Sequence, residues 1–207
     1  MALSKIQTGL VDTNAIGATE LNLADSFAFT GTVTGAGNMP LVSSGSSTTN
    51  AGSLEISLNY SNYEHFLLLL SIKGTSTSSS ENLDVRWKRD GQSYNTGSSD
   101  YSVAGHYQDG NSNRNANGQN TMELFWTNYP ATNWVASIWF WNVGNTTKQN
   151  KLESSIMKAK SDGNAAYLAH GAINNETNNL NKIIETQFFF TAGDVDEYAY
   201  QLYGVSA

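Results

Sequence analysis

The sequence predicts an all-β protein folded as an antiparallel β-sandwich. Three observations lead to this fold class. Apolar residues recur at every second position in many short stretches, which is the period of a strand with one buried face. Ser, Thr, Asn and Gly are abundant, with Gly alone counting 18, and these residues favour turns over helix interiors. No stretch has a convincing helical period.

The C-terminal stretch 181–205 has the strongest strand signal. It predicts two strands joined by a short turn at Gly193-Asp194, forming a hairpin that closes the core. The first strand is expected to place one set of residues on a single face: Ile184, Thr186, Phe188 and Phe190. The second strand is expected to do the same with Tyr198, Tyr200 and Leu202.

Upstream stretches predict the other strands of the sandwich. In chain order they are 54–60, 65–73, 83–88, 101–108, 122–126, 133–143, 151–160 and 166–173. Runs 65–73 and 133–143 are apolar on both faces, as expected of central or interface-covered strands. Asp90-Gly91 is a strong hairpin turn signal. Roughly ten strands with short connections predict a jelly-roll-like sandwich.

The chain is predicted to have three parts. Residues 54–207 form the sandwich domain, and the polar stretch 41–53 is expected to be a linker. Residues 1–40 have too little apolar surface to fold alone, so they are predicted to be an extended arm for attachment or trimerisation. The arm residues expected to contact neighbouring subunits are Leu3, Ile6, Leu10, Ile16, Leu21, Phe27 and Phe29.

Composition excludes several classes of partner. A net charge of -7 argues against a nucleic-acid backbone or an anionic membrane surface. The apolar run 66–70 is too short to span a bilayer, and no signal peptide is predicted at the N-terminus. The absence of Cys excludes disulfides and thiolate metal sites.

No motif selects a catalytic reaction. His65, His106 and His170 are isolated in sequence, and there is no nucleophile elbow, phosphate-binding glycine loop or zinc helix. The sequence selects no pair of carboxylates for sugar hydrolysis. We therefore expect no enzyme activity and no cofactor.

Two polar segments could bind a cation, but neither pattern is specific. The start of loop 109–120 resembles an EF-hand, yet Arg114 stands where Gly is needed and Asn120 where Glu is needed, so a solvated loop is predicted. The acidic turn 194–197 is expected to be solvated. Cation binding and pairing with Lys or Arg of another subunit remain open for that turn.

Five Trp suit either sugar stacking or a core. Trp87, Trp126, Trp139 and Trp141 are predicted to face inward. Trp134 is predicted to face outward, and loops 91–100, 109–120 and 174–181 are the other expected ligand surface. The candidate contacts to a glycan or partner are Trp134, Asp109, Asn111, Asn113, Arg114, Asn117 and Asn120.

The run KIIETQFFFTAGDVDEYAYQLYGV resembles the C-terminal signature of tailed-phage virion proteins, especially fibre-like proteins of marine phages. That signature is a strand ending in Phe, a small-residue turn and a terminal strand reading Leu-Tyr-Gly-Val/Ile. The residues that carry the resemblance are Ile183, Ile184, Phe188, Phe190, Gly193, Leu202, Tyr203, Gly204 and Val205. Segments 60–63, 83–86 and 21–37 are similar to other parts of this group, whereas the acidic turn 194–197 departs from it.

The resemblance implies a non-enzymatic β-sandwich, usually trimeric, that decorates the virion. We therefore expect a tail-fibre-like or appendage subunit, made in the host cytoplasm and anchored to other virion proteins by its arm. Host surface polysaccharide is an open ligand. A capsid decoration protein (cement or head fibre) is the alternative, and a glycan-degrading enzyme is a third hypothesis. No nucleic acid or membrane insertion is expected.

Overall fold

A computed structural model of the protein describes residues 39–205, apart from short gaps at 76–80, 98–99, 108–111, 128–132, 147, 160–165 and 176–180. Only the backbone is described for residues 81, 105–107, 112–118, 125–127, 158–159 and 166–175. The strands of the described residues are β1 (Leu41–Ser47), β2 (Leu54–Ser57), β3 (His65–Gly74), β4 (Glu81–Arg89), β5 (Tyr101–Tyr107), β6 (Ser112–Gln119), β7 (Met122–Thr127), β8 (Trp134–Trp141), β9 (Lys151–Ala159), β10 (Ala166–Asn175), β11 (Ile183–Phe190) and β12 (Val195–Val205).

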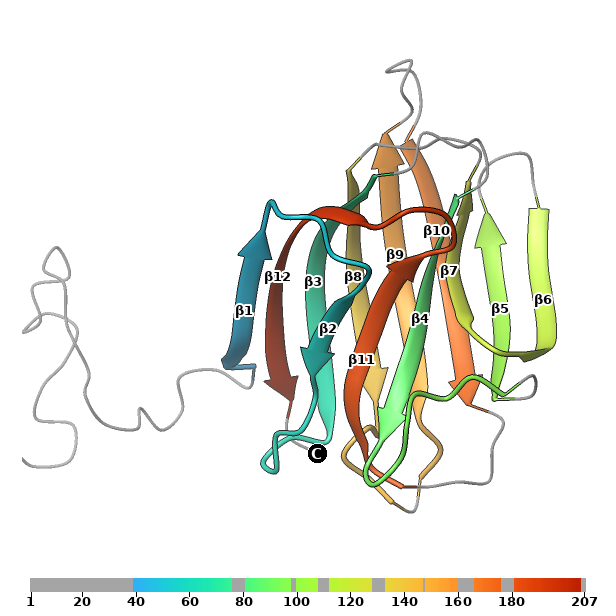
Figure 1. The fold of residues 1–207 in the computed structure, drawn as a ribbon. Helices are drawn as coiled ribbons and strands as arrows, with labels where there is room; N and C mark the ends of the chain where they lie inside the picture. Colours follow the sequence, from blue (N-terminus) through green and yellow to red (C-terminus); the bar gives the residue numbers. More distant parts are fainter. Residues whose placement is uncertain are drawn as a thin grey trace, which may run out of the picture. The chain divides into compact units, whose positions relative to one another are not determined.

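These strands form two packed sheets (Figure 1). One sheet has eight strands in the order β1-β12-β3-β8-β9-β10-β5-β6, and the other has four in the order β2-β11-β4-β7. Neighbouring strands pair antiparallel throughout. The predicted antiparallel β-sandwich is therefore confirmed. The described residues contain no helix long and apolar enough to cross a membrane.

The strand pairs are nested as in a jelly roll. β5 pairs with β6, β4 with β7, β3 with β8, β2 with β11 and β1 with β12. Successive nested pairs alternate between the two sheets, as if one long antiparallel ribbon were rolled up. Strands β9 and β10 extend this plan, because they lie between β8 and β5 in the eight-stranded sheet.

The last two strands do not form the predicted hairpin. β11 lies in the four-stranded sheet and β12 in the eight-stranded sheet, so the turn at 191–194 crosses from one sheet to the other. Gly193 allows this crossing with a φ of 92°. The residues of β11 that face the core also differ from the prediction at the start of the strand. A register shift between Ile183 and Glu185 buries Ile183 in place of Ile184.

The predicted linker 41–53 is wrong in its first half, where β1 pairs with β12. The phenol ring of Tyr200 packs closely against this polar strand. A Cβ on Gly45 would lie 2.8 Å from Cε1 of Tyr200, so any larger residue would have to displace the ring. The hydroxyls of Ser43 and Tyr200 are hydrogen-bonded at 3.2 Å, and Val42 packs against the core.

The predicted loop 109–120 is also wrong over most of its length. Residues 112–119 form β6 at one edge of the eight-stranded sheet, paired with β5. The Asn-rich sequence has no apolar alternation, because an edge strand can pair through its backbone without burying a side chain. Backbone hydrogen bonds to β5 hold this strand, and a pattern of side chains in the sequence cannot reveal them.

The core lies between the sheets and includes Phe66, Trp87, Tyr101, Phe140 and Phe188, each fully buried. Tyr101 joins the two sheets: its hydroxyl accepts from the Trp87 backbone N–H at 3.0 Å and donates to the Asn95 carbonyl at 3.2 Å. Burial raises the pKa of the Tyr101 phenol, so the neutral form that donates this bond is favoured.

Two buried charged residues also serve the fold. The guanidinium of Arg89 donates to Oδ1 of Asn150 at 3.0 Å and to the carbonyl of Asn181. The carboxylate of Asp84 accepts from Oγ1 of Thr121 at 2.8 Å. Both groups therefore hold loops onto β4.

Candidate functional site

The outer face of the eight-stranded sheet is the side turned away from the four-stranded sheet, and it is the most distinctive surface of the described residues. Alternation along β3 sets which residues reach it: Phe66, Leu68 and Leu70 are buried, whereas Leu67 and Leu69 point outward. The same alternation along β8 buries Trp134 and Ala136 and exposes Val135.

Two rows of residues cross the middle of this face. The register of the paired strands aligns Ser44, Gln201, Leu69, Ser137 and Ser155 in one row. It aligns Ser46, Ala199, Ser71, Val135 and Met157 in the next row. None of these residues is charged, so a surface spanning five neighbouring strands has only hydroxyl, amide and apolar side chains.

Three large apolar side chains of these rows are exposed. Leu69 is 41% exposed, Val135 49% and Met157 48%. Together with the serines they line an open groove of about 700 Å³ that runs from β1 to β9. Three exposed apolar side chains beside uncharged polar ones make this groove a candidate interaction site.

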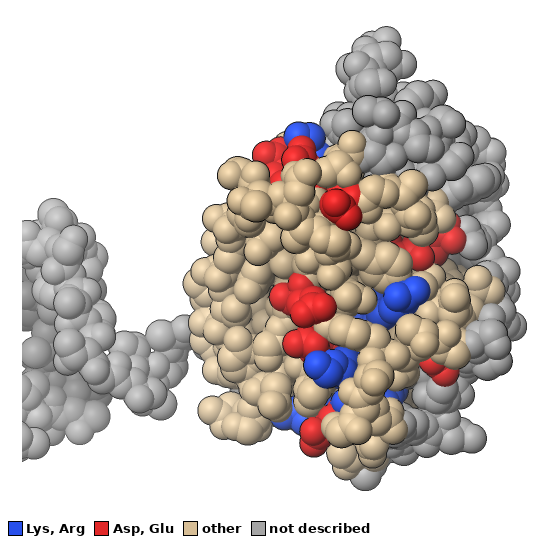
Figure 2. Space-filling view, viewed as in Figure 1, with Lys and Arg blue, Asp and Glu red and all other residues tan. Residues whose placement is uncertain are grey.

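The outer face of the four-stranded sheet is different, because it is charged (Figure 2). Lys88 Nζ lies 3.1 Å from Oε1 of Glu185, and the guanidinium of Arg86 lies 4.4 Å from the centre of the Phe189 ring. Glu55 accepts from Nε2 of Gln187 at 3.2 Å. This side of the sandwich therefore has the alternating charges of an ordinary solvated surface.

Glu185 is the best-partnered carboxylate of that charged side. The Tyr94 hydroxyl donates to its Oε1 at 2.7 Å, and this bond, aided by Lys88, lowers the pKa of Glu185 below its ordinary value of 4.5. A lowered folded-state pKa means that the interaction stabilises the fold above the unfolded-state pKa. The contribution disappears as the pH falls through the folded-state pKa.

We expect Glu185→Gln to make the unfolding free energy less dependent on pH below about pH 5. Denaturant titrations of both proteins at several acidic pH values measure this slope. The control is Glu153→Gln, which removes an exposed carboxylate from β9. Equal flattening in both variants would show that net charge, rather than the Tyr94 bond, sets the slope.

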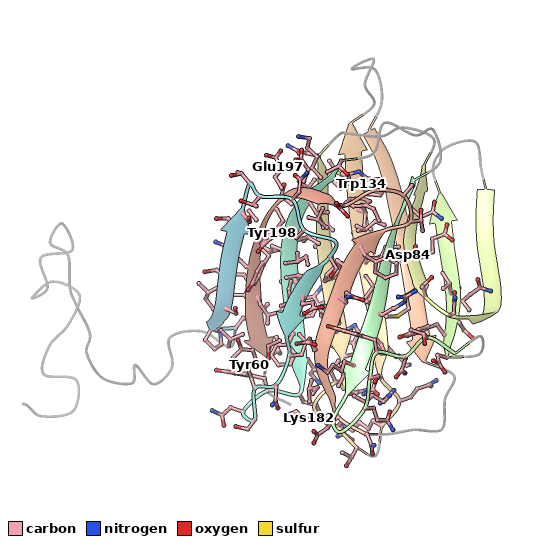
Figure 3. The ribbon with its side chains drawn as sticks, viewed as in Figure 1. Tyr60, Asp84, Trp134, Lys182, Glu197 and Tyr198 are labelled. Carbon is pink, nitrogen blue, oxygen red and sulfur yellow. The ribbon has the colours of Figure 1, made fainter. Side chains whose placement is uncertain are left out.

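An ion pair lies at one end of the outer face. Lys73 Nζ lies 2.5 Å from Oδ2 of Asp196 and 3.7 Å from Oε1 of Glu197. Glu197 is labelled in Figure 3. The hydrogen bond to Asp196 raises the pKa of Lys73. Two carboxylates of the acidic turn therefore face a lysine of the same chain. Among the described residues no group of acidic and histidine side chains has the arrangement of a metal site.

The other end of the face is aromatic. Trp139 and Trp141 stack with ring centres 5.0 Å apart and planes 10° apart. The ring of His65 on β3 contacts the ring of Trp141, with ring centres 5.3 Å apart, and Nδ1 of His65 accepts from the Asn142 backbone N–H at 2.9 Å. Both tryptophans are half-buried, so part of each ring reaches the surface.

The predicted orientation of the β8 tryptophans is therefore wrong. Trp134 is 1% exposed and packs edge-on against Phe190, with ring centres 5.8 Å apart, between the two sheets (Figure 3). Trp139 and Trp141 point outward instead. The stretch is apolar on both faces, and such a pattern identifies a strand without telling which face is buried. Trp87 is buried as predicted, and the side chain of Trp126 lies outside the described residues.

The other candidate contacts are not brought together with Trp134. Asp109 and Asn111 lie outside the described residues, and Asn113, Arg114 and Asn117 lie on β6, where only the backbone is described. Asn120 is exposed in the turn before β7. A ligand role for these residues stays a prediction. The arm residues Leu3 to Phe29 also lie outside the described residues.

The strand register brings two of the three histidines together. His170 on β10 pairs directly with His106 on β5, and His170 also pairs with Ser155 on β9. His65 lies on β3 beside Trp141. Residues far apart in the sequence thus become neighbours through strand pairing, which spacing along the chain does not show.

Comparisons with known proteins yield one weak structural similarity. The sequence matches no family model and no curated protein. Among solved structures, the chain is similar to the VP2 subviral particle of infectious bursal disease virus with 13% identity and a TM-score of 0.16. The alignment covers 78% of this chain and 38% of that chain. At this TM-score the alignment carries no argument about fold or function.

Proposed function

We propose that this protein is a non-enzymatic structural subunit of a virion, a tail-fibre-like or appendage protein that self-associates through the outer face of its eight-stranded sheet. The observation that carries the proposal is the difference between the two sheet faces. One face has charged, paired side chains, whereas the other has two uncharged rows with exposed Leu69, Val135 and Met157. Buried contact surfaces between subunits are depleted of charge in the same way.

Two further observations support a virion subunit. The C-terminal residues Leu202, Tyr203 and Gly204, which carry the resemblance to phage virion proteins, lie in β12, between β1 and β3 of this sheet. The nested strand pairs follow the jelly-roll plan, which recurs in viral capsid and lectin domains. The likeness to jelly-roll domains is an analogy of fold, so it supports an appendage and a capsid decoration protein equally.

Attachment is assigned to the arm, residues 1–40. We expect a chain lacking residues 1–36 to fold like the full chain but to be absent from particles of the virus that encodes it. Mass spectrometry of purified particles measures incorporation, and circular dichroism of the purified variant checks its fold. Particles that contain the truncated chain in normal amount would contradict the attachment role.

Glycan binding is a second candidate function, and the outward stack of Trp139 and Trp141 favours it. Sugar rings bind to exposed aromatic faces beside hydrogen-bonding groups, and Glu153 lies directly across from Trp139. Host polysaccharide should then bind the full chain, and the double variant Trp139→Ala with Trp141→Ala should lose binding in calorimetry. A variant with residues 109–120 replaced by Gly and Ser tests the loop instead. Loss of binding in the loop variant alone would reject the tryptophan stack as the site.

A further inference from the structure

The unpaired edge of β1 is the starting observation. β1 lies at one end of the eight-stranded sheet and pairs with β12 on one side. In the part of the chain that the structure describes, no strand pairs with its other side. A free strand edge presents a row of backbone donors and acceptors, which another strand can use for pairing.

β1 differs from the other three edge strands in charge. β2 includes Glu55, β7 includes Glu123 and the sequence of β6 includes Arg114. β1 reads LVSSGSS and has neither a charge nor a proline. Charges, prolines and bulges are the usual protection of an edge against pairing with other chains. Residues 43–47 of β1 lie beyond the register shift between Leu41 and Ser43 and have none of these protections.

The absence of charged residues in β1 favours a second copy of this chain as the partner. In a twofold contact each strand meets its own copy, so a charged residue in that strand would meet the same charge. β1 alone among the four edges avoids this repulsion. Its outward side chains, Ser44 and Ser46, are small enough to let two such strands lie side by side.

Neighbouring surface also supports pairing at this edge. Leu41, at the start of β1, is 52% exposed, and Met39 just before it is 36% exposed. The groove on the outer face reaches β1, where Ser44, Gly45 and Ser46 line it. A strand added to β1 would therefore cover apolar surface and extend the groove into the second copy.

We propose that β1 pairs antiparallel with β1 of a second copy, about a twofold axis perpendicular to the sheet, so that one sheet continues through both copies. The pairing rests on the proposed function in that the chain self-associates, and it adds a second contact, at the β1 edge, to the one proposed for the outer face. A twofold contact gives two copies, whereas the resemblance to virion proteins implies three. The mass of the purified full chain decides between them.

The first test adds charge to the edge. Ser44→Lys with Ser46→Lys brings four like charges to the contact, and we expect the dissociation constant of the dimer to rise about tenfold or more in analytical ultracentrifugation. The matched control is Ala199→Lys with Gln201→Lys, which adds the same charges to the outer face one strand away from the edge. Equal weakening by both pairs of lysines would assign the effect to the outer face and reject β1 pairing. Thermal unfolding of each variant shows that the sandwich remains folded.

The second test uses the absence of native Cys. Single variants Ser43→Cys, Ser44→Cys, Ser46→Cys and Ser47→Cys are oxidised in the full chain. Disulfides need Cα atoms about 4.4–6.8 Å apart, so a twofold pairing should give cross-linked dimers at one position and little at the others. Equal cross-linking at all four positions would reject the pairing. If no single variant cross-links, the double variant Ser44→Cys with Ser46→Cys tests a twofold axis at Gly45, and the absence of cross-links there as well would reject the pairing.

The remaining outcomes separate the two proposals. A dimer that survives the β1 lysines but is lost when charges are placed on Leu69, Val135 and Met157 overturns β1 pairing and leaves the proposed function. A wild-type trimer overturns the twofold contact alone. A chain that is monomeric at every concentration overturns both.

Discussion

Lysine at Leu69, Val135 and Met157 together is expected to abolish association of the chain through its outer face while leaving its fold and the β1 edge intact. These side chains are 41%, 49% and 48% exposed, so their replacement creates no cavity in the core. If the outer face is an interface, each new ammonium must either lose its water on association or hold the subunits apart. The expected loss is therefore several kcal/mol of the association free energy of the outer face, so that at micromolar concentration only pairing at β1 remains.

Light scattering coupled to size exclusion measures this result directly. The matched control places the same three charges at exposed positions away from the outer face, by Ser57→Lys, Ser61→Lys and Ser93→Lys. The control should keep the wild-type mass, because its charges face solvent. If both triple variants dissociate alike, net charge controls association and the outer face is not the interface.

Trp134→Ala is expected to lower the free energy of unfolding by about 3–5 kcal/mol. The ring is 1% exposed and packs against Phe190, so its removal leaves a large cavity between the sheets. Trp139→Ala removes the same atoms from the outward side of the same strand. It should lower the free energy of unfolding by about 1 kcal/mol, mainly through lost stacking on Trp141.

Denaturant unfolding of the two variants compares one residue type on both faces of a single strand. A large difference places Trp134 in the core and Trp139 outside it. Equal losses, or a larger loss for Trp139→Ala, would contradict the orientation of β8. The comparison matters for function because only the outward tryptophans can stack with a sugar.

Alternating apolar residues were sufficient to predict the fold class. Leu54 and Ile56 of β2, and Leu83, Val85 and Trp87 of β4, are buried at every second position as their pattern predicts. Where the pattern was apolar on both faces, as in β8, it identified the strand but not its buried side. Where it was polar, as in β1 and β6, it missed the strand.

These failures share a physical reason. An edge strand is held by backbone hydrogen bonds, which are the same for every residue except proline, so Ser and Asn can form it as well as Val. β1 pairs with β12, in which Tyr200 lies opposite Gly45 although the two residues are 155 positions apart in the sequence. No local pattern reports a contact over that distance.

By itself the sequence determined an antiparallel sandwich, most of its strands, the exclusion of disulfides and a surface chemistry poor in charge. Only the tertiary structure decided which strands share a sheet, that β11 and β12 belong to different sheets, and that uncharged residues from five strands meet on one face. The reason is that side-chain alternation is a property of one strand. Strand pairing and register depend on where the whole chain brings its strands together.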